Sequence, residues 1–169
     1  MSLTRNMRDG TLIIEDGDSN TLTLDTDEGD FSCEWGNDPR VVKQRGALSH
    51  LRDGDEETLS GTLNVKVSKI RADYSSLGGS DTDPTPYDAL LQKGPASAWD
   101  SVGTAGEPYQ IKLTLKIANP DTTGRREVVE IDKLRVGRVT FSEGDEYDTL
   151  AFPFTANITE PTITFEAQS

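Results

Sequence analysis

Apolar and polar residues alternate along several stretches of the chain with a period of two. Between residues 110 and 117 every second residue is Ile or Leu, and Gln, Lys or Thr stand between them. Such a period is typical of antiparallel strands that bury one face and expose the other. The strands predicted in this way span residues 11–15, 21–25, 30–35, 40–44, 58–67, 109–118, 128–132, 136–142, 149–158 and 162–165.

Turn signals separate these strands, and one helix is predicted among them. The triplet Asp16-Gly17-Asp18 favours a tight hairpin between the first two strands. The helix is predicted over residues 86–93, because Thr85 suits the N-terminal cap and Pro86 suits the first helical position. Gly94 suits a left-handed stop at its end.

These elements predict a single mainly β domain over residues 1–169, an antiparallel β-sandwich or barrel with one short inserted α-helix. The length is that of one domain. A long mobile loop is expected near residues 46–57, and irregular loops are expected near 75–85 and 95–108, where small and polar residues dominate.

Composition narrows the function classes. The formal net charge is -13, which argues against a protein that grips nucleic acid with Lys and Arg. Neither an N-terminal apolar signal core nor a run of about 18 apolar residues is present, so synthesis in the cytoplasm without a membrane anchor is expected.

Candidate chemical sites are few, and neither an enzyme, a cofactor nor a metal site is predicted. His50 is the only histidine and Cys33 the only cysteine, so a zinc site or a catalytic triad lacks partners. The run Asp16-x-Asp18-x-Asn20 begins like a calcium loop, but Thr21 stands where a glycine is needed. A hairpin turn is the preferred interpretation there.

Charge is distributed unevenly along the chain. Residues 39–52 contain Arg40, Lys43, Arg45 and Arg52 but no acidic residue, whereas acidic residues dominate on both sides. Two interpretations stay open: a solvated loop with a chance run of basic residues, or a segment that meets an acidic surface on a neighbouring copy of the chain. Complementary charge of this kind sets register and orientation more than affinity.

The order of these parts resembles that of the tail tube proteins of long non-contractile phages. The resemblance covers nearly the whole chain and rests on a hairpin at 9–17, a basic strand with an Arg45-Gly46 turn, and the helix at 86–94. It also includes two Gly-Asp-Glu corners, at 54–56 and 144–146, that precede alternating strands. The same fold occurs in contractile tail tubes, type VI secretion tubes and gene transfer agents.

The resemblance implies a structural subunit of the virion tail. Such subunits form hexameric rings that stack head to tail into a tube, whose acidic lumen would let DNA pass without specific binding. The implied partners are further copies of the chain and the tape measure, tail tip and tail terminator proteins. The alternative is a monomeric β-sandwich binding module of a tail tip or cell surface.

The loop at 46–57 and the basic strand before it are the predicted contact between copies. Turn signals bound the loop, and its apolar residues need a partner to cover them. We expect the loop to leave the body of the subunit and to become ordered on assembly. The predicted inter-subunit or ring-stacking residues are Arg40, Lys43, Arg45, Gly46, Leu48, His50, Leu51, Arg52, Asp55 and Glu56.

Overall fold

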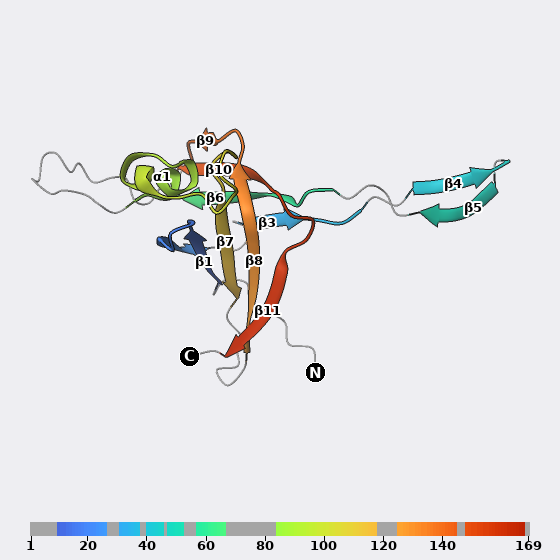
Figure 1. The fold of residues 1–169 in the computed structure, drawn as a ribbon, viewed down its shortest axis with the longest axis horizontal. Helices are drawn as coiled ribbons and strands as arrows, with labels where there is room; N and C mark the ends of the chain where they lie inside the picture. The colour runs from blue at the N-terminus through green and yellow to red at the C-terminus, as the bar shows by residue number, and fades with distance from the viewer. Residues whose placement is uncertain are drawn as a thin grey trace, which may run out of the picture.

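The computed structural model describes residues 10–26, 31–37, 40–45, 47–52, 57–66, 84–117, 125–144 and 148–167. Within these ranges nine strands form one antiparallel sheet in the order β2-β1-β7-β8-β10-β6-β3, with β11 beside β8 and β9 beside β10 (Figure 1). The strands are β1 (Gly10–Glu15), β2 (Thr21–Thr26), β3 (Phe31–Glu34), β6 (Ser60–Lys66), β7 (Ile111–Ile117), β8 (Arg125–Val136), β9 (Thr140–Ser142), β10 (Thr149–Ala156) and β11 (Thr162–Ala167). The predicted class, mainly antiparallel β with one short helix, is confirmed.

Strand β8 joins the two halves of this sheet. Its first six residues pair with β11 and its last three pair with β10. Its other edge pairs with β7, where Leu113 faces Ile131 but Ile111 faces Leu134. β8 therefore contains one extra residue, a β-bulge, and Lys133 within it has a left-handed φ of 52°.

The bulge explains one error of the sequence prediction. Separate strands were predicted at 128–132 and 136–142, but β8 runs without a break from Arg125 to Val136. Residues beyond the bulge keep their partners on β7 and β10, so pairing continues where the alternation of the sequence changes phase. β8 ends at Val136, Gly137 still donates a backbone hydrogen bond to Pro153 of β10, and the short β9 follows.

Burial in the body of the molecule follows the predicted alternation. Both halves of the sheet contribute to a single core, together with the helix and the segment after it. Full burial of one such side chain stabilises the fold by about 1.5–3 kcal/mol relative to exposure. The largest fully buried side chains are Phe152, Leu12, Ile14, Leu59, Leu63, Ile111, Leu113, Ile131 and Leu134.

Gly61 interrupts the apolar face of β6 for a steric reason. A Cβ at this position would collide with the carbonyl oxygen of Ser32 and would lie 2.6 Å from the ring of Phe154. The glycine leaves room for Phe154, whose ring stacks on that of Phe31 with centroids 6.0 Å apart. The absence of a side chain thus allows two aromatic rings to pack across β6.

Helix α1 (Pro86–Leu91) begins where the sequence predicts. The Thr85 hydroxyl accepts a hydrogen bond from the Asp88 backbone N–H, and the Asp88 carboxylate accepts one from the Thr85 N–H, which makes a capping box. The helix ends at Leu91, two residues earlier than predicted, and Gln92 with φ 53° is its left-handed cap. Gly94 is left-handed as predicted, with φ 52°, but it begins the 3-10 helix η2 (Gly94–Ala98). No helix in the described ranges is long and apolar enough to span a membrane.

A hydrogen bond connects α1 to the sheet. The Tyr109 hydroxyl donates to the Ala89 carbonyl oxygen at 2.9 Å, just before β7 begins. Burial raises the pKa of Tyr109, with a smaller contribution from the charge of Asp16, so the phenol keeps the proton that it donates.

Strands β4 (Arg40–Gln44) and β5 (Ala47–Arg52) form a two-stranded sheet of their own. Figure 1 shows this hairpin apart from the body of the molecule, on the side away from α1. The prediction of a loop over 46–57 is therefore wrong for residues 47–52, because each strand of the hairpin satisfies the backbone of the other. Val67, the corner at 54–56 and most of the loop predicted near 75–85 lie outside the described residues.

Candidate functional site

The β4–β5 hairpin brings together most of the predicted contact residues. Arg40 is the register partner of Arg52, Val42 that of His50, and Lys43 that of Leu48. Leu51 lies opposite Val41, and Arg45 occupies the turn with a left-handed φ of 52°. Gly46, Asp55 and Glu56 lie outside the described residues. The basic run of the sequence therefore lies on one projecting element.

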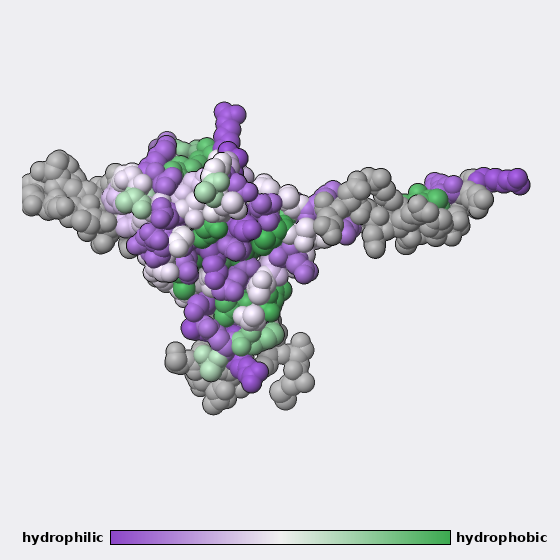
Figure 2. Space-filling view, in the orientation of Figure 1, coloured by the Kyte–Doolittle hydropathy of each residue, from purple (hydrophilic) through white to green (hydrophobic). Residues whose placement is uncertain are grey.

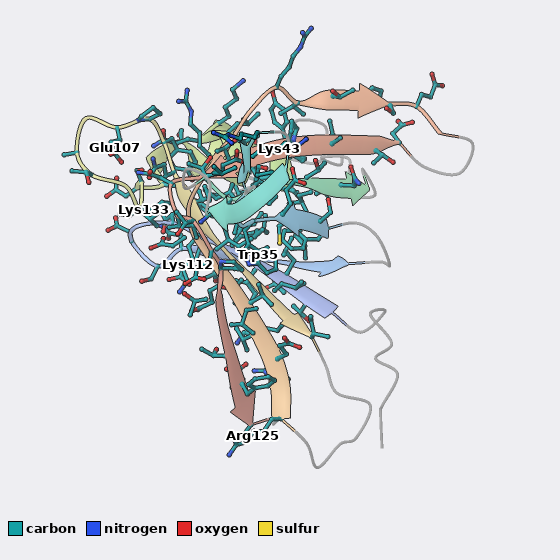
Figure 3. The ribbon with its side chains drawn as sticks, turned by 90° about the vertical axis from the view of Figure 1, so that its right-hand side faces the viewer. Trp35, Lys43, Glu107, Lys112, Arg125 and Lys133 are labelled. Carbon is teal, nitrogen blue, oxygen red and sulfur yellow. The ribbon has the colours of Figure 1, made fainter. Side chains whose placement is uncertain are left out.

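Several side chains of the first strand of the hairpin and of its turn are exposed to solvent. Val41 is 54% exposed, and the Lys43 and Arg45 side chains are exposed as well. Figure 3 views the molecule from the side of the hairpin and shows Lys43 on it, with Trp35 lower in the view. An isolated two-stranded hairpin is marginally stable in water, and exposed apolar side chains on it are suited to a partner surface.

The turn between β1 and β2 forms an acidic corner on the body. Asp16 is 2% exposed, and its carboxylate accepts hydrogen bonds from the backbone N–H groups of Asp18, Asn20 and Asp100 and from the Asn20 side-chain amide. Burial acts to raise the pKa of Asp16, but the hydrogen bonds from Asn20, Asp100 and Asp18 together hold it below its usual value. The carboxylate is thus occupied by N–H donors, as a hairpin turn requires.

Asp18 in the same turn differs from Asp16. It is exposed, and the nearby charge of Asp100 raises its pKa above the usual value. Two like charges at this corner leave an acidic spot on the surface, of opposite sign to the hairpin.

The far end of β8 and β11 extends beyond the core, and the sequence did not reveal its exposure. Ile163 is 45% and Phe165 59% exposed on β11. Figure 2 shows hydrophobic residues among hydrophilic ones over this part of the molecule. The alternation at 162–165 predicts a strand with one buried face. In the structure this strand extends past the core, so its apolar residues are exposed.

The opposite face of the same strands carries ion pairs. Glu166 accepts from Arg126 and lies 3.1 Å from the Lys116 ammonium. Its pKa is lowered, chiefly by the hydrogen bond from Lys116. Lys112 pairs with Glu130 at 2.9 Å, and this hydrogen bond raises the pKa of Lys112. These partly exposed pairs orient the strands more than they stabilise them.

Cys33 is half-buried, and burial raises the pKa of its thiol. A thiol in such an environment stays protonated at neutral pH and is a poor nucleophile.

The sequence matches no family model and no curated protein. Solved structures of similar fold exist. A chain in the six-fold symmetrised baseplate of the anti-feeding prophage superposes with a TM-score of 0.59 at 8% identity, covering 97% of this chain and 97% of that one.

Two further structures agree. A chain in the tube-terminating cap of the anti-feeding prophage has a TM-score of 0.53 at 10% identity, covering 98% of this chain and 94% of that one. A chain in the sheath/tube terminator of an extracellular contractile injection system, PVC, has a TM-score of 0.53 at 10% identity, covering 99% and 96%. At such identities the likeness shows the fold alone. Over nearly its whole length, the chain has the β fold of phage-tail-like injection machines.

Proposed function

We propose that the chain is a structural subunit of a phage tail tube or a related tube, and that it assembles into stacked hexameric rings. The observation that carries the proposal is the β4–β5 hairpin, which stands apart from the body and carries basic residues but no acidic one, on a chain with a net charge of -13. The fold likeness to chains of a six-fold symmetrised baseplate and of tube terminators supports it.

The hairpin would contact the next ring or the neighbouring subunit. It lies on one side of the body, whereas α1 and β1 lie on the other (Figure 1). A contact between two different surfaces of identical subunits is heterologous, and such contacts generate rings or filaments. Opposite charge on the hairpin and on the acidic body favours that arrangement and sets its register.

An acidic tube would be a conduit for DNA. Duplex DNA is held by proteins that neutralise its phosphates, and a net charge of -13 per subunit does the reverse. At physiological salt the repulsion reaches only about 8 Å from the wall, which prevents adhesion without blocking passage. The tape measure, tail tip and tail terminator proteins would be the partners in such a tail.

The test is replacement of the hairpin, residues 40–52, by a short Gly-Ser linker. We expect concentrated wild-type protein to form rings or tubes in negative-stain electron microscopy. The shortened protein should keep its circular dichroism spectrum and its cooperative unfolding but stay monomeric. A matched control replaces the exposed body turn at 104–107 by Gly-Ser residues and should still assemble.

Two results would overturn the proposal. If the shortened protein forms normal tubes, the hairpin is not the contact between copies. If the wild-type protein stays monomeric at high concentration, also with tail tip or tape measure proteins added, the monomeric binding module is the better interpretation.

A further inference from the structure

A cavity of about 560 Å³ lies where β8 and β10 meet the segment that precedes β6. Its volume is within the range of about 300–1,000 Å³ that is common for ligand pockets. The residues that matter here are Lys133, Arg135, Gln110, Thr58, Thr155 and Asn157, all in its wall.

The β-bulge of β8 contributes Lys133 to this wall. Lys133 adopts a left-handed φ of 52°, a conformation that is unfavourable for a residue with a Cβ. Its carbonyl oxygen accepts a hydrogen bond of 3.0 Å from the Asn157 N–H, and Arg135 is the register partner of Thr155. In Figure 3, Lys133 lies far from Arg125, which is at the other end of β8.

The two cations of this pocket differ from the lysines of β7. Lys112 and Lys116 are each paired with a glutamate. In the part of the chain that the structure describes, neither the Lys133 ammonium nor the Arg135 guanidinium has an ion-pair partner. On a chain with 30 acidic and 17 basic residues, two neighbouring unpaired cations are suited to an anion from outside.

Gln110 does not define what the pocket binds. Its Oε1 atom is buried against Gly103, where an added Cβ would lie 2.6 Å from it, so a molecule in the pocket does not reach that atom. The two cations alone set the requirement, which is an anionic partner. A peptide segment with several acidic side chains provides carboxylates for both of them.

We infer that this pocket binds a carboxylate-bearing segment of a second copy of the chain. The choice of a second copy rests on the proposed function, in which copies are neighbours. The segment at 53–57 is the best candidate, because four of its residues are acidic and it follows the hairpin directly in sequence. A hairpin that reaches a neighbouring copy would bring this segment with it.

The experiment titrates the full-length protein, at a concentration where it is monomeric, with a capped peptide that has the sequence of residues 53–57. Isothermal titration calorimetry compares the wild type with Arg135→Glu, Arg135→Gln and Lys133→Glu. The control is Arg138→Glu, because Arg138 is exposed, lies outside the pocket wall and gives the same change of charge. A second peptide carries Asn and Gln in place of Asp and Glu, and inorganic phosphate and a short DNA duplex serve as further probes.

We expect the acidic peptide to bind the wild type and the Arg138→Glu variant with affinities that agree within about twofold. Its affinity for the Arg135→Glu variant should be lower by about tenfold or more. Arg135→Gln should be intermediate and shows that the loss is not caused by misfolding. Equal losses with Arg138→Glu, equal affinity for the amidated peptide, or equal binding of phosphate or duplex would overturn the inference, as would no binding at all. Tube formation is measured separately. Peptide binding without assembly would refute only the proposed tube function, and assembly without peptide binding would refute only the proposed role of the pocket.

Discussion

Strand β1 of the body and strand β5 of the hairpin have the same length but different surroundings. Each has six residues, yet β1 pairs with strands on both edges and buries Leu12 and Ile14 completely. Among the residues that the structure describes, β5 pairs only with β4, in a sheet separate from the body. The body therefore holds the stability of the fold, and the hairpin is left to interact with another molecule.

Truncation of a core aromatic should have the largest effect. Phe152→Ala removes a fully buried ring, and we expect a loss of about 3–5 kcal/mol in the free energy of unfolding, measured by urea denaturation. The control is Phe165→Ala, at a ring that is 59% exposed, which should change stability by about 0.5 kcal/mol or less. Equal losses would mean that β11 is covered in the free subunit.

Asp16→Asn tests the acidic corner of the body. It replaces a buried carboxylate that accepts several hydrogen bonds, and we expect a loss of about 2 kcal/mol at pH 7. Because the folded pKa of Asp16 is lowered, its contribution is complete above the unfolded pKa of about 3.9 and is lost as pH falls through the lower folded pKa. The difference between wild type and variant should therefore shrink below about pH 4.

Asp18→Asn is the matched control for this prediction. Its pKa is raised by the charge of Asp100, so removal of the Asp18 charge should leave stability at pH 7 unchanged or slightly higher. A loss as large as that of Asp16→Asn would contradict the assigned roles of the two carboxyl groups.

Thr85→Ala removes the cap of α1 and should cost about 1 kcal/mol, since one backbone N–H loses its acceptor. Thermal unfolding measures the change, and Thr104→Ala, at an exposed turn, is the control. An unchanged melting temperature for Thr85→Ala would show that the cap is redundant with the packing of Leu90.

The smallest effect on stability is expected in the hairpin. Val41→Thr alters a side chain that is 54% exposed, so the free energy of unfolding should stay within about 0.5 kcal/mol of wild type. The concentration needed for tube formation, followed by light scattering, should rise because an apolar contact is lost. A large loss of stability with unchanged assembly would reverse the comparison between body and hairpin.

The candidate site was predicted from the sequence in part. The basic run from Arg40 to Arg52 can be identified in the sequence, and so can the turn signals on either side. That residues 47–52 form a strand is not visible, because apolar and polar residues do not alternate there with a period of two. The register that places Arg40 opposite Arg52 depends on the irregularity between Val42 and Lys43. The pocket around Lys133 escaped prediction, since its residues come from distant parts of the sequence.

The sequence alone determined the features that depend on interactions between residues close together in the chain. Period-two alternation sets which residues of a strand share a face, and the side chains of Thr85 and Asp88 start a helix through bonds between near neighbours. Tertiary structure decided what depends on distant partners. The bulge at Lys133 follows from the need to pair β8 with three different strands. The absence of a side chain at Gly61 follows from the space that the ring of Phe154 occupies. The exposure of Phe165 depends on where the core ends, and that boundary is a property of the assembled sheet.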